Sequence, residues 1–418
     1  MQQDILKRII LENQEIIKNK KIISREFYIP NTDNIVVFIG IRRCGKTFTL
    51  YENAKNIEPE NILFLDFEDE RLISLNTLES YDIIIDSYKS LYPDRKPILF
   101  FDEIQNLKNW HFYLKRLHVN NYKIFVTGSN ANLISRDIAT YLKGRSIEIN
   151  IYPFSFKEFL KIKEIKIKKT DFYTKQHVIL NLFEEFMQYG GFPEIIKTTE
   201  DDKRTIAKNI YNLLFYKDLI TKFDKEEYLL KLVVNKIAEN IGKEFSITSL
   251  ANKIISVYKT TVPTITSYFN ILPEPFLTSN IYQYRTSFIA RQSKRKTYLA
   301  DNSFIYLNRI TTDKSRLFEN LIFNYLLREY KEVFYYKTKN NKEVDFFINH
   351  NNTKKLIQAS YVIDSFDTKN REISSLLKAM EELSVKKAFI YTLNNSEDVL
   401  LDDKHIKILP FWEVLLKN

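Results

Sequence analysis

Five short apolar runs alternate with helical segments in the first 154 residues, and they constrain the fold more than any other feature of the chain. The runs are β-branched or aromatic and carry few charges, which is typical of buried strands. They cover residues 34–40, 61–69, 97–103, 122–130 and 145–154. Strands that alternate with helices predict right-handed crossovers, and therefore an α/β fold built on a parallel sheet.

A glycine-containing octapeptide follows the first run, in a chain with only seven glycines among 418 residues. Residues 40–47, GIRRCGKT, fit the pattern G-x-x-x-x-G-K-[ST] between a strand and a helix. The glycines let backbone N–H groups curl around phosphate oxygens, and the helix start adds further donors. Lys46 is placed to reach the β- and γ-phosphates, and the Thr47 hydroxyl to ligate Mg²⁺. The pattern therefore predicts a site for ATP and Mg²⁺ made by Gly40, Ile41, Arg42, Arg43, Cys44, Gly45, Lys46, Thr47 and Phe48.

Polar residues also end two other runs, at the sheet edge where parallel sheets bind ligands. Asp102 and Glu103 follow the run ILFF. We expect Asp102 to hold the Mg²⁺ shell and Glu103 to accept a proton from the attacking water, or to orient it. Ser129 or Asn130, from the sequence TGSN, is expected to lie between that water and the γ-phosphate. Ordinary strand ends and turns also use such residues, so a structural role remains an alternative.

Three arginines are candidates for neutralising charge on the γ-phosphate. Arg42 and Arg43 lie inside the octapeptide, and Arg145 follows Gly144. Each could act within the chain or across a subunit boundary, and a solvated arginine is an equally good interpretation. We select Arg145 as the sensor or finger. Cys44, the only cysteine, is expected to be a spacer.

Six segments together resemble the AAA-family ATPases of bacteria and archaea that carry a C-terminal domain of unknown function, DUF4143. They are GIRRCGKT, ILFFDEIQNL, VTGSNANLIS, LKGRS, YPFSFKEFL and YGGFPE. The resemblance runs from about residue 25 to near the C-terminus. It implies an AAA-type core with strand order 5-1-4-3-2, a helical lid, a winged-helix region and a C-terminal domain of restriction-endonuclease-like fold. The expected parts are an N-terminal helix (1–24), the core (25–154), the lid (155–222), the winged-helix region (223–296) and the nuclease-like domain (297–418).

A basic stretch lies where the winged-helix region is expected. Residues 253–300 contain seven basic residues and a single acidic one, Glu274, which gives a net charge of +6 out of +10 for the whole chain. We expect Lys294, Arg295 and Lys296 to contact the phosphates of DNA or RNA. A protein-docking module with a solvated basic rim is the alternative.

The last part of the chain follows the order of PD-(D/E)XK nucleases only in part. Glu319 on a helix and Asp345 on a strand match, but Gln358 and Ser360 stand where a glutamate and a lysine are expected. An amide carries no charge for a metal, and serine supplies no cation. We therefore predict a nuclease-like domain that is inactive. Glu343 could partly restore a site, but we expect it to face the opposite side of its strand from Asp345.

These features predict an ATP-hydrolysing protein of the cytoplasm. Its nucleotide state would control a C-terminal module that binds nucleic acid or a partner protein, with a homo-oligomer also possible. One cysteine excludes an intrachain disulfide. No run reaches the roughly 18 apolar residues of a membrane span, so we expect no membrane partner. The alternatives are an ATP-gated, metal-dependent nuclease and an ATP-dependent switch or scaffold without nucleic acid.

Overall fold

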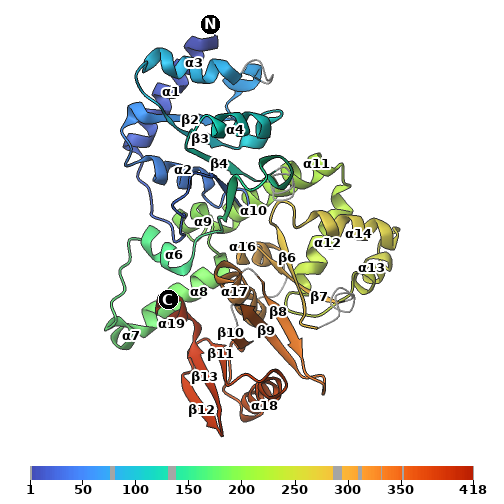
Figure 1. Ribbon diagram of the computed structural model, residues 1–418. Coiled ribbons are helices and arrows are strands. Elements are labelled where there is room, and N and C mark those ends of the chain that lie inside the picture. Colours follow the sequence, from blue (N-terminus) through green and yellow to red (C-terminus); the bar gives the residue numbers. More distant parts are fainter. Residues whose placement is uncertain are drawn as a thin grey trace. The chain divides into compact units, whose positions relative to one another are not determined.

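The computed structural model describes residues 2–75, 81–129, 138–285, 294–308, 313–330, 332–350 and 353–417. Two compact units make up the chain (Figure 1). The first is Met1–Tyr152 with Glu274–Phe276, and the second is Pro153–Pro273 with Leu277–Asn418. No described helix combines the length and the apolar character that crossing a membrane requires.

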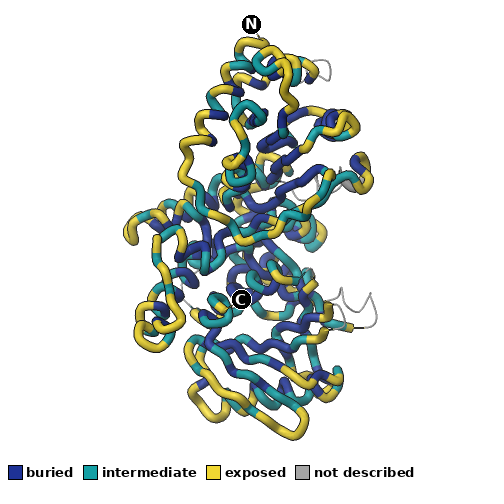
Figure 2. The backbone as a smooth tube through the Cα atoms, turned by 60° about the vertical axis from the view of Figure 1, so that its left-hand side comes forward, coloured by how far each residue is buried: buried dark blue, intermediate teal, exposed yellow. Residues whose placement is uncertain are grey.

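The first unit is built on a five-stranded parallel sheet in the order β2-β3-β4-β1-β5. This order confirms the predicted 5-1-4-3-2, because the two describe the same sheet read from opposite edges. The central strands are fully buried (Figure 2), as their apolar runs predict. The strands are β1 (Ile35–Ile39), β2 (Ile62–Asp66), β3 (Ile98–Asp102), β4 (Ile124–Gly128) and β5 (Ser146–Asn150). The main helices between them are α2 (Lys46–Ala54), α3 (Asp82–Leu91) and α4 (Trp110–Val119).

The N-terminal helix α1 (Gln2–Asn19) covers the edge of this sheet. The side-chain amide of Asn13 donates to the carbonyl of Phe64 at 3.0 Å, and that of Gln14 donates to the carbonyl of Ile62 at 2.8 Å. Both carbonyls belong to β2, an edge strand whose backbone would otherwise lack partners on that side. The predicted surface helix therefore also closes the sheet.

Most of the segment expected to be the lid, residues 155–222, is helical, and it belongs to the second unit. Helix α6 begins at a capping box in which Ser155 and Glu158 bond each other's backbone N–H groups. Helices α8 and α10 pack against α16 (Asn302–Leu307), so this segment is part of the core of the second unit. Its role as a lid stays a prediction. The helices are α6 (Phe156–Ile162), α7 (Asp171–Thr174), α8 (Gln176–Tyr189), α9 (Pro193–Lys197), α10 (Lys203–Leu213), the π-helix η6 (Leu214–Ile220) and α11 (Thr221–Phe223).

An eight-stranded mixed sheet forms the rest of the second unit, in the order β12-β13-β11-β10-β9-β8-β6-β7. Helix α18 (Phe366–Leu383) packs over β9, β10, β11 and β13, and α17 (Lys314–Glu329) contacts β10 and β7. The strands are β6 (Thr278–Gln283), β7 (Arg295–Leu299), β8 (Phe334–Lys337), β9 (Glu343–His350), β10 (Thr353–Ala359), β11 (Lys387–Thr392), β12 (Glu397–Leu401) and β13 (Lys404–Pro410), with α19 (Phe411–Lys417) at the end.

The predicted boundary between residues 296 and 297 is wrong, because it falls inside β7. Strands β6 and β7 pair with each other, and β6 also pairs in parallel with β8. The expected wing strands are thus the edge of the larger sheet. Three helices precede them: α12 (Glu227–Glu239), α13 (Ile247–Ile255) and α14 (Val262–Ile271). The winged-helix assignment itself stays a prediction.

Candidate functional site

The octapeptide forms a tight loop between β1 and α2. A Cβ atom on Gly40 would lie 2.1 Å from the carbonyl oxygen of Ile151, so only glycine fits there. Gly45 caps α2 with a φ of 103°, a conformation that favours glycine. The Cys44 thiol is buried and donates to the Ile151 carbonyl at 3.2 Å. Burial raises the pKa of this thiol, which supports the prediction that it is a spacer.

Arg25 holds the loop from outside the motif. Its guanidinium donates to the Cys44 carbonyl at 3.0 Å and to the Tyr152 carbonyl at 2.7 Å. The loop is therefore tied to the segment that follows β5. This role could not be predicted, because Arg25 precedes the first strand in a charged segment without a pattern.

The side chains of Thr47 and Asp102 meet beneath the loop. The Thr47 hydroxyl donates to Asp102 Oδ2 at 2.6 Å, and the Thr127 hydroxyl donates to Asp102 Oδ1. Lys46, only 4% exposed, lies 3.4 Å from the Ile41 carbonyl oxygen, and its Nζ is 3.6 Å from Glu103 Oε1. The structure thus brings together the lysine, the threonine and the two carboxylates that the sequence selected.

The two neighbouring carboxylates have different electrostatic surroundings. Burial and the adjacent Glu103 charge raise the pKa of Asp102 to about 7. Burial alone would raise the pKa of Glu103 too, but the Lys46 ammonium and the Gln105 amide outweigh it, and the pKa is lowered. Glu103 is therefore ionised near neutral pH, as a proton acceptor must be, and Asp102 lacks a cation among these contacts.

The backbone of Glu103 is left-handed, with a φ of 47°, which is uncommon for a residue other than glycine. Its N–H donates to the Thr127 hydroxyl at 2.9 Å, which helps to hold this conformation. Gln105 was missed by the sequence analysis. Its amide nitrogen donates to Glu103 Oε2 at 2.5 Å and lies 3.4 Å from Ser129 Oγ. Ser129 therefore reaches the site, while Asn130 lies outside the described residues.

The three candidate arginines differ in position. Arg42 pairs with Glu68 at 3.0 Å, and Arg43 is exposed with a φ of 68°. The carbonyl of Arg145 accepts from the N–H of Ile35, at the start of β1. Because the octapeptide follows the other end of β1, Arg145 begins roughly 16 Å from the loop, measured along the strand. This distance disfavours an action of Arg145 within its own chain, which leaves the two other interpretations, an action across a subunit boundary and a solvated arginine.

A second cluster of charges lies in the second unit, centred on Lys296. Its Nζ is 2.8 Å from Glu343 Oε1, 3.2 Å from Asp345 Oδ1 and 3.4 Å from Glu319 Oε1. The Tyr298 hydroxyl also donates to Glu319, at 2.8 Å. The lysine side chain is 0% exposed. Burial would lower the pKa of Lys296, but these carboxylates raise it well above its ordinary value, so the lysine is charged.

Two predictions about this region are wrong. Lys296 cannot contact a nucleic acid, because its side chain is fully buried among carboxylates. Glu343 does not face away from Asp345: residues two apart on a strand share a face, and both reach the same ammonium. Lys294 is exposed and lies 3.4 Å from Glu244, while the Arg295 guanidinium packs over the rings of Phe269 and Tyr282.

Of Gln358 and Ser360, only Gln358 contacts this cluster, and it does so through an uncharged amide. The side-chain oxygen of Gln358 accepts from the N–H of Asp345 at 3.3 Å. The hydroxyl of Ser360 donates to the Val362 carbonyl at 3.3 Å. The other oxygen of Asp345 accepts from the N–H of Ala359 at 3.0 Å. Both residues thus have hydrogen-bond partners within the second unit, and the degenerate nuclease site stays a prediction.

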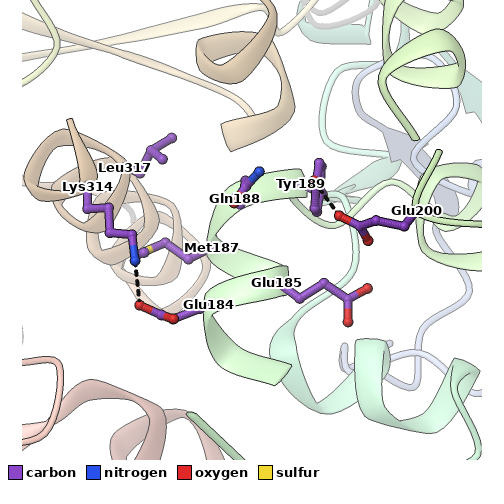
Figure 3. A pocket seen from close by; sticks show the side chains of 8 residues that line it. All are labelled: Glu184, Glu185, Met187, Gln188, Tyr189, Glu200, Lys314 and Leu317. Atoms are coloured by element: carbon purple, nitrogen blue, oxygen red, sulfur yellow. Dashed lines mark hydrogen bonds and ion pairs between the residues drawn. The ribbon is translucent and has the colours of Figure 1, made fainter. Parts of the chain in front are cut away.

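A pocket of about 310 Å³ also lies in the second unit (Figure 3). Its carboxylates already have cations: Lys314 bonds Glu184 at 2.8 Å, and Lys203 bonds both Glu185 and Glu200 at 2.6 Å. The pocket therefore offers little uncompensated charge to a ligand. The lining residues are Glu184, Glu185, Met187, Gln188, Tyr189, Glu200, Lys314 and Leu317.

Comparisons with known proteins match most of the chain. Family models described as AAA domain, Domain of unknown function (DUF8612) and Domain of unknown function (DUF4143) match residues 32–160, 180–314 and 314–414. An uncharacterised protein of Methanocaldococcus jannaschii is 33% identical over 98% of this chain and 94% of its own length. An uncharacterised protein of Haemophilus influenzae is 32% identical over 78% of this chain and 84% of its own.

Two solved structures are similar at a low level. DnaA from Aquifex aeolicus, bound to AMPPCP, is 13% identical over 63% of this chain and 85% of its own, with a TM-score of 0.29. Drosophila ORC bound to AT-rich DNA and Cdc6 is 8% identical over 73% of this chain and 90% of its own, with a TM-score of 0.20. The assignment therefore rests on the family models, the full-length relative and the sheet order. The chain belongs to the family of proteins that join an AAA domain to a C-terminal DUF4143 domain.

Proposed function

We propose that the first unit binds ATP with Mg²⁺ and hydrolyses it. The observation that carries this proposal is the convergence of Lys46 and Thr47, from the phosphate-binding loop, on Asp102 and Glu103, from the end of β3. Titratable groups with shifted pKa values that gather beside a phosphate-binding loop are candidates for a functional site. An AAA domain assigned to residues 32–160 supports the same conclusion.

The residues present fit a Mg²⁺ ion. Thr47 Oγ1 and Asp102 Oδ2 are 2.6 Å apart, and hydroxyl and carboxylate oxygens are the hard ligands that Mg²⁺ prefers. These two residues would hold the ion, which when bound supplies neutralisation of phosphate charge. Without a cation the buried carboxyl of Asp102 has its pKa raised to about 7, so a positive charge beside it would favour the ionised form.

Each remaining residue has a role that follows from its position. Backbone N–H groups of the loop and the start of α2 bind the phosphates, and Lys46 neutralises the terminal ones. To reach them, the Lys46 ammonium must leave Glu103, 3.6 Å away. Glu103 then accepts a proton from the water that attacks the γ-phosphorus, as the bond to the ADP oxygen breaks. Gln105 holds the Glu103 carboxylate in place through its 2.5 Å bond.

We further propose that the nucleotide state controls a surface of the second unit that binds nucleic acid. The support is charge: residues 253–300 carry +6. With Lys296 buried, the lysines able to meet a phosphate backbone are Lys253, Lys259 and Lys294, all exposed. Docking of a partner protein is the alternative from another class.

A salt titration tests this surface. Binding through phosphates weakens with salt, with a slope of roughly −0.9 for each contact on duplex DNA. Replacing Lys253, Lys259 and Lys294 with alanine should therefore flatten the slope by up to about 3 and leave basal ATPase activity intact. Fluorescence anisotropy of labelled DNA across salt measures it. The matched control replaces the exposed Lys166, Lys168 and Lys169. Equal slopes in both variants would favour the protein-docking alternative.

The competing function is an ATP-gated nuclease that uses Glu319, Glu343 and Asp345. The structure disfavours it, because an ammonium already contacts all three carboxylates. We therefore expect supercoiled, linear and single-stranded DNA to stay intact with Mg²⁺ or Mn²⁺, with or without ATP, on agarose gels. Cleavage by the wild-type chain that disappears in Asp345→Asn would promote the nuclease instead.

A further inference from the structure

We infer that Lys296 is a built-in cation: its ammonium occupies the position between Glu319, Glu343 and Asp345 that a divalent metal would need, and it keeps this site free of metal. The inference concerns the second unit and is independent of ATP hydrolysis in the first. The cluster of Lys296 with these carboxylates would then stabilise the fold of the nuclease-like domain and would not bind a catalytic metal.

One atom makes all three contacts. Lys296 Nζ lies 2.8 to 3.4 Å from one oxygen of each carboxylate, and these come from separate elements: Glu319 from α17, Glu343 and Asp345 from β9. The three carboxylates therefore share one cation, the Lys296 ammonium. Lys296 belongs to β7, an edge strand that β8 and β6 separate from β9 in the sheet. Among the described residues, no group of three or more histidines, cysteines or acids is arranged to hold a metal ion.

The ammonium itself is shielded from water. The side chains of Lys296 and Tyr298 are 0% exposed, and the Tyr335 ring lies 5.7 Å from the ammonium. Gly242 closes another side, since a Cβ there would lie 2.1 Å from Glu319 Oε2. A metal could enter only if the lysine left, and a buried ammonium that left three carboxylates would lose all of its compensation.

A second lysine also neutralises carboxylates in this region. Lys337 also contacts Glu343, at 3.4 Å, and it bonds Glu244 at 2.7 Å. Lys296 and Lys337 therefore both contact Glu343, and Lys296 alone contacts Glu319 and Asp345. Removing Lys296 leaves Glu319 and Asp345 without a cation in these contacts. A divalent ion could then take the place of the ammonium.

The test is Lys296→Met in the full chain, which removes the charge and keeps most of the side chain's length. We expect its Tm to fall by on the order of 10 °C. Manganese alone, at millimolar concentration and without nucleotide, should then raise its Tm by about 5 °C, because an ion that binds only the folded state stabilises it. Lys294→Met removes the same charge from an exposed position two residues earlier and is the control; its Tm should not respond.

A titration of the wild-type chain with Mn²⁺, followed by electron paramagnetic resonance, does not depend on whether the variant folds. We expect wild type and Asp345→Asn to bind the same amount of Mn²⁺, because the carboxylates already hold the lysine. Wild-type binding that is lost in Asp345→Asn would overturn the inference. A folded Lys296→Met chain with no response to Mn²⁺ would overturn it as well.

Discussion

Replacing Lys46 with alanine should abolish ATP turnover, lowering the rate by about two orders of magnitude or more. Lys46 is the cation of the phosphate-binding loop, and its ammonium lies beneath the loop beside Glu103, 3.6 Å away. In a water-poor site such a charge stabilises the developing phosphate charge far more than in solvent, and removing one preorganised donor typically costs 10²–10³-fold in rate. ATP binding measured by calorimetry and phosphate release measured at saturating ATP separate the two effects.

The control for this variant is Lys89→Ala, which removes the same charge from an exposed position of α3. It should leave both measurements unchanged. Circular dichroism must show that Lys46→Ala is folded, because the change also leaves the buried Glu103 carboxylate without its cation. Normal turnover in a folded Lys46→Ala chain would mean that residues 40–47 are an ordinary turn.

The parallel core could be predicted because its signals are local. Each strand is a short run with few charges, and the motif residues of the first unit lie at or just after the ends of such runs. Parallel pairing then places those ends at one edge. The same rule, applied more strictly, would have disfavoured an action of Arg145 within its own chain: it precedes β5, so it belongs to the opposite edge from Gly40.

Lys296 could not be predicted, because its partners are distant in sequence. Glu319 and Asp345 are 23 and 49 residues away, and nothing near Lys296 distinguishes a buried lysine from a solvated one. Its neighbours Lys294 and Arg295 made the segment resemble a basic surface. Only the pairing of β6 with β8, which joins the expected wing to the larger sheet, brings the ammonium to the carboxylates.

Gln105 was missed for a different reason. It stands two residues after Glu103, within the segment ILFFDEIQNL, but an uncharged amide in a short helical turn carries no pattern. The left-handed backbone of Glu103 turns the chain so that the Gln105 amide meets the carboxylate. This contact depends on the backbone dihedral angles of Glu103, and the spacing of residues in a motif does not reveal such angles.

Glu103→Gln should separate binding from hydrolysis. The amide keeps the size of the side chain, so the loop, Lys46 and Thr47 remain able to bind ATP. The proton acceptor is lost, and general-base catalysis typically contributes 10²–10⁴-fold, so turnover should fall by about that factor. The lowered pKa of Glu103 makes it the ionised member of the carboxylate pair, whereas the pKa of Asp102 is raised to about 7. A single-turnover assay with radiolabelled ATP measures the chemical step.

Two comparisons decide what a slow Glu103→Gln enzyme means. Glu70→Gln makes the same change at an exposed position of the first unit and should hydrolyse ATP at the wild-type rate. Asp102→Asn should instead raise the Mg²⁺ concentration that turnover requires, because it removes the charge of the carboxylate proposed to hold the ion with Thr47. If Glu103→Gln turns over normally while Asp102→Asn does not, the base lies elsewhere, and Glu103 is then a structural partner that holds Lys46 in the absence of nucleotide.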